Sequence, residues 1–366
     1  MLYYLKELEE AFGPLRVFES ITFRAIGAAV TTFLVSLVCG PVIIRMLTRL
    51  KLGQPIRGAE EVHKLAELHG SKKGTPTMGG LMILLTLLVG CVLWANPENI
   101  YLWVVLIPTL LFGALGFADD YLKIKRKQSE GLTSRQKLLG QMVISVAVGI
   151  FLITFPETAE AARSLQLPFL KEPVVDNLGP LAVIFFCLVI VGCSNAVNLT
   201  DGLDGLAIGC SIPVIAVFGV FAYAVSNAVA ADYLLLEFSP GSEELVIFCG
   251  ALGGACVGFL WFNCHPARVF MGDTGSLALG GAFAVLSICL NQELLLVILG
   301  GVFVMEAMSV ILQVFFFKTT GKRIFAMSPI HHHFELKGWN ETTVVVRFWI
   351  MGVVCALMAL ATLKLR

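Results

Sequence analysis

Charged residues are scarce in this sequence, where Asp, Glu, Lys and Arg make up only 14% of 366 residues. Hydrophobic residues make up 57%, a share that excludes an ordinary water-soluble globular protein. Acidic and basic residues number 26 each, so the net charge indicates no partner, and nothing points to nucleic acid. The composition and the long apolar runs predict an all-α, polytopic integral membrane protein.

Other common signatures are also missing. The ten cysteines include no C-x-x-C pair and most lie in apolar runs, so we interpret them as small buried residues without disulfide bonds or zinc. The first 20 residues combine several Glu with no long apolar run, which argues against a cleavable signal peptide. We expect a short interfacial helix there, ending near Gly13 and Pro14. Glycine pairs such as Gly300 and Gly301 are interpreted as close helix packing.

Apolar stretches long enough to cross a bilayer recur along the whole chain. They predict about ten transmembrane helices, near residues 21–44, 78–95, 100–118, 138–156, 178–197, 206–226, 244–262, 276–290, 293–316 and 344–363. The break between the eighth and ninth is the short polar sequence Asn291, Gln292 and Glu293.

The connections between these spans divide between two membrane faces. One face holds most of the lysines and arginines, in residues 45–77, 119–137, 198–205, 263–275 and 317–343. The positive-inside rule makes this face cytoplasmic and, with an even number of spans, makes both termini periplasmic. We therefore expect one membrane-embedded domain, residues 1–366, whose five cytoplasmic loops carry the site.

A polar stretch lies between the apolar runs 181–191 and 206–223. It contains two carboxamides and two carboxylates, Asn195, Asn198, Asp201 and Asp204. Such groups are costly within a membrane unless they meet water or a polar ligand. Hard oxygen donors and amides suit Mg²⁺ and a phosphorylated sugar or nucleotide. The alternative is a polar turn between two helices, with Gly202 and Gly205 as the turn residues.

Two more motifs can be interpreted either as parts of a binding site or as ordinary structural features. Lys72, Lys73, Thr75 and Thr77 precede a span, where they can hold phosphate oxygens or form a basic cluster that sets topology. The adjacent pair Asp119 and Asp120 is expected at the end of the third span, where like charges and the helix dipole require compensation. A bound Mg²⁺ would supply it, and so would surface ion pairs with Lys123 and Arg126.

The last two cytoplasmic loops add an aspartate and a histidine run. Asp273 stands between glycines before a span, either directed into a site or acting as a helix N-cap. Phe270 can stack on a base, or it is an ordinary interfacial aromatic residue. His331, His332 and His333 point in different directions on a regular backbone, so they suit phosphate contacts better than one zinc ion. His63, His69 and His265 are expected to be incidental.

Together these groups favour metal-assisted phosphoryl transfer, which needs carboxylates for Mg²⁺ and cations for phosphate. A secondary transporter is the competing interpretation. That class of protein would need charged residues near the bilayer midplane and inverted repeats. The sequence shows no inverted repeats, and Glu306 is the one candidate for a charge near the midplane.

The motifs resemble the polyprenyl-phosphate N-acetylhexosamine-1-phosphate transferases. The resemblance covers nearly the whole chain, through residues 72–80, 117–123, 195–205, 258–276 and 327–339. The run Pro-Ile-His-His-His-x-Glu-Leu-x-Gly-Trp is similar to the branch that uses muramoyl-pentapeptide substrates, whereas a relative acting on UDP-GlcNAc would differ in this loop.

The resemblance implies an activity and a setting. Phospho-MurNAc-pentapeptide would pass from UDP-MurNAc-pentapeptide to undecaprenyl phosphate, giving lipid I and UMP, with Mg²⁺ as cofactor. The enzyme would be a homodimer in the bacterial cytoplasmic (inner) membrane, contribute to peptidoglycan synthesis, and face the cytoplasm with its active site.

It also implies roles for single residues. Asp273 resembles the principal Mg²⁺ ligand, with Asp119 and Asp120 beside it, and Asp120 resembles the proposed base. Uridine and diphosphate contacts are implied for Asn198, Asp201, Gly202, Asp204, Asn263 and Phe270, and phosphate contacts for Lys73, Lys123, Lys137, His331, His332 and His333. From the residue pattern, Asn195 and Thr75 join the substrate-binding set. A lipid monophosphate is already largely a dianion at neutral pH, so we expect direct attack without a covalent aspartyl intermediate.

Overall fold

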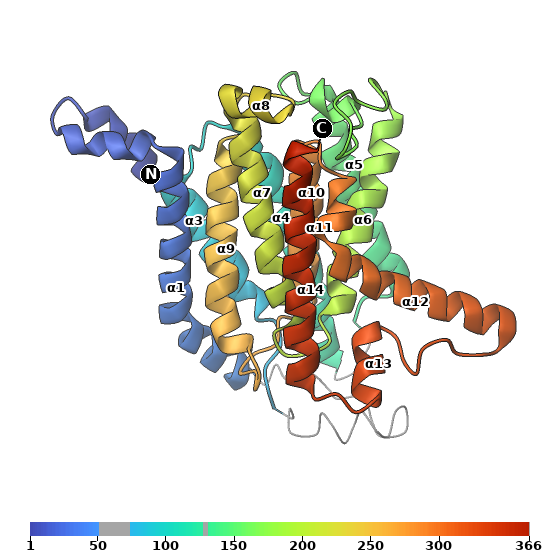
Figure 1. The fold of residues 1–366 in the computed structure, drawn as a ribbon. Coiled ribbons are helices and arrows are strands. Elements are labelled where there is room, and N and C mark those ends of the chain that lie inside the picture. The colour runs from blue at the N-terminus through green and yellow to red at the C-terminus, as the bar shows by residue number, and fades with distance from the viewer. Residues whose placement is uncertain (51–73, 127–130, 366) are drawn as a thin grey trace.

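The structure is a computed structural model that describes residues 1–50, 74–126 and 131–365 (Figure 1). Within these residues it is helical, without strands. Nine of its helices are long and apolar enough to cross a membrane. They are α1 (Ile21–Arg49), α4 (Ile100–Arg126), α5 (Ser134–Thr154), α6 (Leu181–Thr200), α7 (Leu206–Ser226), α9 (Glu244–Asn263), α10 (Gly272–Cys289), α12 (Gly301–Thr320) and α14 (Glu341–Ala361). The prediction of an all-α polytopic membrane protein is confirmed.

Shorter elements complete the described chain. The apolar helix α3 (Gly80–Trp94) stands where a tenth span was predicted but is shorter than the others. The remaining helices are α8 (Ala228–Leu234), α11 (Leu295–Leu299) and α13 (Ile330–Leu336), with 3-10 turns at Ala161–Arg163 and Thr362–Lys364. Both chain termini lie toward one end of the bundle, and α13 lies toward the other (Figure 1). We call the end with α13 the distal end.

Helix α10 is the centre of the bundle. Each of its residues except Asp273 is buried, because its neighbours, chiefly α4 and α6, surround it. The approach of α4 is closest at Gly116, where an added Cβ would lie 2.1 Å from the backbone oxygen of Asp273. A glycine is therefore needed at this crossing. The close packing brings the end of α4 directly beside the start of α10.

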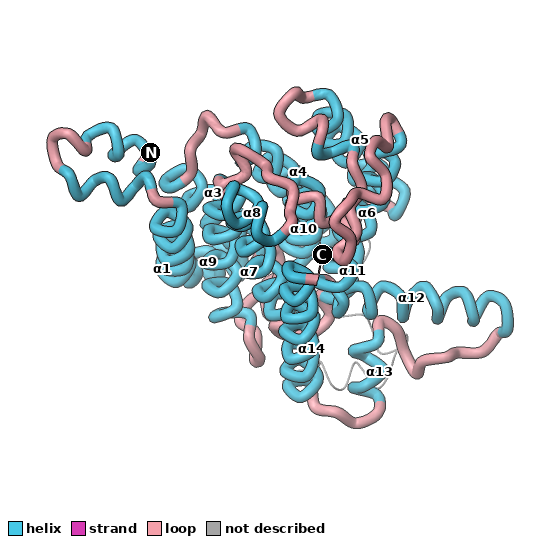
Figure 2. The backbone as a smooth tube through the Cα atoms, turned by 45° about the horizontal axis from the view of Figure 1, so that its top comes forward, coloured by secondary structure: helices cyan, strands magenta, loops and turns pink. Residues whose placement is uncertain are grey.

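The predicted single span 293–316 is wrong. Two helices occupy this region, because α11 ends at Leu299, Gly300 caps it, and α12 begins at Gly301. Helix α12 then leans away from the other helices (Figures 1 and 2). Gly301 does pack closely, since an added Cβ would lie 2.8 Å from the Cys355 sulfur. Gly300 marks the break instead, and no polar residue accompanied it to reveal the interruption.

The N-terminal segment also differs from the prediction of one helix ending near Gly13 and Pro14. Two 3-10 helices form, Leu2–Leu8 and Gly13–Glu19. Pro14 lies near the start of the second helix, where its missing N–H costs nothing. The pair projects sideways from the bundle at the end where both termini lie (Figure 1).

Candidate active site

The first part of the site is the distal end of α4. The sequence predicted that the helix ends at Asp119 and Asp120, but it continues to Arg126. This places Lys123 one turn further on, with its Nζ 2.7 Å from Asp119 Oδ2 and 3.7 Å from Asp120 Oδ1. The predicted conflict with the helix dipole therefore does not arise. The expected cationic compensation is present, because residues four apart on a helix share a face.

Asp273 brings four helices to one point. Its Oδ2 lies 2.8 Å from Lys123 Nζ of α4 and 2.9 Å from Lys137 Nζ of α5. Its Oδ1 accepts a hydrogen bond from Asn198 Nδ2 of α6 at 2.7 Å. Asp273 itself is the second residue of α10, and its side chain does not serve as the N-cap. The aspartate, predicted in a loop, is instead held on a helix by two cations and an amide.

Asp120 is fixed by the first turn of α10. Its Oδ2 accepts hydrogen bonds from the backbone N of Thr274 at 3.0 Å and from the Thr274 hydroxyl at 2.8 Å. Gly272, at φ +71°, leaves room for this carboxylate, because an added Cβ would lie 2.6 Å from Asp120 Oδ2. Asp119 accepts a bond from the backbone N of Leu132 at 2.6 Å. Each carboxylate is thus held by a different element.

Asp119, Asp120 and Asp273, which we call the Asp cluster, fit a divalent cation. Each offers an oxygen within 4.8 Å of those of the other two. Three carboxylates face two lysines, so the cluster keeps an excess of negative charge that a hard cation would balance. The Thr77 hydroxyl beside Gly272 is buried and has no hydrogen-bond partner among residues 1–50, 74–126 and 131–365, although a buried hydroxyl normally has one. These observations indicate a site that binds a charged ligand.

The turn between α6 and α7 borders the Asp cluster. Burial, together with the negative charges of Asp273 and Asp120, raises the pKa of Asp201 to about 8. Gly202 follows it and lies against His331, since an added Cβ would be 2.2 Å from His331 Nε2. The shift favours the neutral form of Asp201 as long as no cation stands beside it.

Asp204 and Asn263 tie this turn to the α9–α10 connection. Asp204 Oδ2 accepts from the backbone N of Ala267 at 3.0 Å. Asn263 donates to Val269 O at 2.8 Å and accepts from Gly205 N at 3.1 Å. Both side chains thus organise the segment that leads to Asp273. Their predicted substrate contacts stay predictions.

His265, expected to be incidental, is part of the same arrangement. Its Nδ1 lies 3.3 Å from Asp204 Oδ2 and 3.6 Å from Glu341 Oε2. No local sequence pattern indicates this contact, because Glu341 is distant along the chain. Phe270 is partly buried, and its backbone pairs with Pro76 and Gly79. The stacking of its aromatic ring on a base stays a prediction.

The histidine run lies on α13, and each ring has a different partner. His331 Nδ1 lies 3.1 Å from Glu306 Oε1, and His332 Nδ1 lies 2.7 Å from Glu335 Oε2. His333 Nδ1 accepts from the backbone N of Ala326 at 3.0 Å. The three rings are therefore held by three different partners.

Some predicted residues do not reach the cluster. Asn195 donates to Gln141 Oε1 at 2.9 Å and to Val191 O at 2.8 Å, so it joins α5 to α6. Lys73, His63 and His69 lie outside the described residues, and Thr75 lies near their border. The sequence reasoning missed the roles of Thr274 and Ser276, although both follow Asp273 closely as hydroxyls at a helix start. Ser276 accepts from Asn198 at 2.8 Å.

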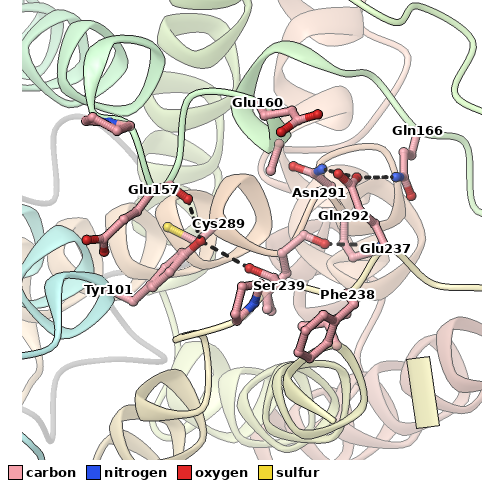
Figure 3. A pocket seen from close by; sticks show the side chains of 15 residues that line it. Tyr101, Glu157, Glu160, Gln166, Glu237, Phe238, Ser239, Cys289, Asn291 and Gln292 are labelled. Carbon is pink, nitrogen blue, oxygen red and sulfur yellow. Dashed lines mark hydrogen bonds between the residues drawn. The ribbon is translucent and has the colours of Figure 1, made fainter. Parts of the chain in front are cut away.

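A polar cavity of about 180 Å³ lies at the opposite end of the same helices (Figure 3). It is lined by residues that begin α4 or follow α5, α8 and α10, including Tyr101, Glu157, Glu237 and Asn291. Lysine, arginine and histidine are absent from the described residues that line it. It therefore lacks the cations of the Asp cluster.

Comparisons with known proteins agree with this geometry. The model of glycosyl transferase family 4 matches residues 102–291, and the phospho-N-acetylmuramoyl-pentapeptide-transferase signature 1 matches residues 72–84. A phospho-N-acetylmuramoyl-pentapeptide-transferase of Methylacidiphilum infernorum (isolate V4) is 55% identical over 366 residues, covering all of both chains. One of Desulfotalea psychrophila (strain LSv54 / DSM 12343) is 53% identical over 368 residues, again covering all of both. The chain therefore belongs to glycosyl transferase family 4 and, within it, to the phospho-N-acetylmuramoyl-pentapeptide-transferases.

Proposed function

We propose that this protein transfers phospho-MurNAc-pentapeptide from UDP-MurNAc-pentapeptide to undecaprenyl phosphate, releasing UMP and giving lipid I for peptidoglycan synthesis. The observation that carries the proposal is the convergence of Asp119, Asp120 and Asp273 with Lys123 and Lys137. Phosphoryl transfer requires little covalent chemistry from the protein but demands positioning and charge stabilisation. The convergence provides groups for both.

Mg²⁺ is the cofactor that we propose for the Asp cluster, where it would neutralise charge on the diphosphate. Asn198 and Thr274 would hold the carboxylates in place for it, because each donates to one of them at 2.7–3.0 Å. Lys123 and Lys137 sit on flexible stems between the carboxylates, so both can turn toward phosphate oxygens when a cation takes up the carboxylate charge.

The attacking group is the phosphate of the lipid carrier. Its second ionisation lies near pH 6, so it needs orientation more than a strong base. Asp120 is engaged by three donors of α10, which suits a fixed ligand. We therefore propose direct attack on the β-phosphate. A phosphosugar ester trapped on any of the three aspartates after incubation with the nucleotide alone would contradict this route.

The orientation in the membrane follows from the same proposal. We place the distal end, with the Asp cluster, at the cytoplasmic face of the bacterial inner membrane and both termini in the periplasm, on the positive-inside rule. Alkaline phosphatase fused after the C-terminus should then be active in cells, whereas an inactive fusion would reverse the orientation. A homodimer is also proposed, and the mass of the purified protein in detergent tests it.

The direct test uses purified protein, undecaprenyl phosphate and UDP-MurNAc-pentapeptide. UMP and a lipid-linked product should appear together with Mg²⁺ and stop when a chelator is added. UDP-GlcNAc serves as the matched control nucleotide. Release of UMP from UDP-GlcNAc, and not from the muramoyl substrate, would assign the chain a different sugar.

A further inference from the structure

Glu306 is a buried carboxyl group that the proposed reaction does not use. It lies within α12, and its exposed fraction is 0%. Ionisable groups inside a membrane helix are costly and usually functional. Its side chain has one hydrogen-bond partner among the described residues, His331, at 3.1 Å from Oε1 to Nδ1, while Oε2 has none.

His331 is equally enclosed. Its exposed fraction is 0%, and its second ring nitrogen, Nε2, has no hydrogen-bond partner within the described part of the chain. This atom lies against Gly202, in the turn that also holds Asp201 and borders the Asp cluster. A buried ring nitrogen without a partner costs about 1–3 kcal/mol. Such an atom beside a phosphoryl-transfer site points to a ligand.

The charge of the pair determines what Nε2 can do. Burying a net charge without compensation is far more costly than burying a neutral pair. Two neutral arrangements of Glu306 and His331 form a strong hydrogen bond between them. The carboxylate can face an imidazolium, or the protonated carboxyl can donate to a neutral ring at Nδ1, and in both arrangements Nε2 carries a proton. In a third neutral arrangement the carboxyl accepts from Nδ1–H, which gives a weaker bond, leaves the carboxyl O–H buried without an acceptor among the described residues, and is therefore disfavoured.

We propose that Glu306 is a positioning residue that keeps Nε2 of His331 protonated, so that His331 is a hydrogen-bond donor to a phosphate group of the substrate and not a base. The identity of that acceptor rests on the proposed function, whereas the protonation of Nε2 does not. A phosphate oxygen supplies the partner that Nε2 lacks, and Gly202 must move from the ring to admit it. The absent side chain at Gly202 makes this approach possible.

The protonation is tested by solid-state NMR of protein labelled with ¹⁵N-histidine, in lipid bilayers at pH 8. The His331 signals are identified by their loss in His331→Asn. We expect Nε2 to be protonated in the wild type and partly unprotonated in Glu306→Gln. A neutral carboxamide can accept from Nδ1–H or donate to an unprotonated Nδ1, so it allows both neutral tautomers of the ring. Glu306→Asp keeps the carboxyl group and should restore protonation. An unprotonated Nε2 in the wild type, or full protonation in Glu306→Gln, overturns the proposal.

The role in substrate binding has its own measurement. A charge-assisted hydrogen bond contributes enough that Glu306→Gln should raise KM for the UDP-sugar by about tenfold to a hundredfold, with a smaller change in kcat. Glu306→Asp should recover part of this loss. A merely structural role would instead lower the melting temperature in both variants and leave KM unchanged, which would overturn the link to substrate.

Glu293 provides a matched control. It is also buried in the bundle, with an exposed fraction of 3%, and both of its carboxyl oxygens lack a partner among the residues that the structure describes. It lies at the end of α10 away from the Asp cluster. Glu293→Gln should leave KM and the His331 signals unchanged. Should the wild type transfer no phosphosugar at all, the proposed function fails, while the NMR result still decides the protonation of His331.

Discussion

Two polar regions lie at opposite ends of the bundle and satisfy their carboxylates differently. Near the cavity of Figure 3, Glu237 Oε2 accepts from Gln166 at 2.8 Å and from Asn291 at 3.0 Å. At the distal end, three carboxylates share two lysine ammonium groups. Neutral amides pair with one carboxylate without adding charge. The Asp cluster instead concentrates charges of both signs, as the binding of a metal ion and phosphates requires.

The difference separates polar groups that stabilise a fold from polar groups that serve chemistry. A single carboxylate with two amide donors needs nothing more. Three adjacent carboxylates repel each other, and two lysines leave part of that repulsion uncompensated. A charged ligand therefore stabilises the second arrangement and not the first.

The sharpest test of this comparison replaces one carboxylate by a carboxamide in each region. Asp273→Asn should lower Mg²⁺-dependent UMP release by about 10³-fold or more, because it removes a charged ligand at the reacting centre. Glu237→Gln should leave the rate unchanged, since its region holds no reacting group. The assay is UMP release by both variants after gel filtration confirms folding. Near-normal turnover of Asp273→Asn would remove Asp273 from the metal site.

A second test measures the charge excess without any assay of activity. Lys123→Met leaves three carboxylates facing one lysine, so the melting temperature should fall in a chelator. Mg²⁺ should raise the melting temperature of this variant more than that of the wild type, because a divalent cation supplies the missing charge. Lys125→Met, at an exposed position on the same helix, is the control. An equal rise in melting temperature with Mg²⁺ in the wild type and both variants would contradict the binding of a divalent cation by the Asp cluster.

A third test concerns the packing that places Asp273 beside α4. Gly116→Ala puts a methyl group 2.1 Å from the backbone oxygen of Asp273, so the two helices must separate. Overpacking of this kind costs about 1–3 kcal/mol, and a displaced metal ligand should lower kcat by about tenfold to a hundredfold. Gly219→Ala, whose Cβ would meet its nearest atom at an ordinary 3.5 Å, should change neither property. Unchanged kcat in Gly116→Ala would show that this crossing does not position the aspartate.

Much of the fold was predictable because apolar length reveals spans directly. The nine long helices and α3 all overlap predicted stretches. The break at Gly300 escaped prediction because an apolar run with glycines looks the same whether the helix continues or bends. The extension of α4 to Arg126 escaped it because hydropathy marks the membrane border and not the helix end. Lys123 reaches Asp119 only because of that extension.

The site was predictable in its residue types and less so in its contacts. Asp119, Asp120, Asn198 and Asp273 were named from the chemistry of Mg²⁺ and phosphate, and the structure brings them together. Asn195 has the same chemistry but faces Gln141. Asn195 and Asn198 are three residues apart on α6, and a helix turns by 100° per residue. The two side chains therefore point in somewhat different directions and meet different neighbours. His265 meets Asp204 and Glu341 only through tertiary packing, which no local pattern encodes.

The smallest effect expected concerns Asp201, at the edge of the Asp cluster. Its pKa is raised to about 8 in the folded protein by burial and by the charges of Asp273 and Asp120. The stability that its protonated form contributes is complete below about 3.9, the ordinary pKa of an aspartate, and is lost as the pH rises through about 8. Asp201→Asn keeps a neutral side chain, so its melting temperature in a chelator should fall less than that of the wild type between pH 6 and pH 9. An equal fall in melting temperature in the two proteins would mean that the Asp cluster does not act on Asp201. The negative charge of the Asp cluster would then be balanced without a metal ion.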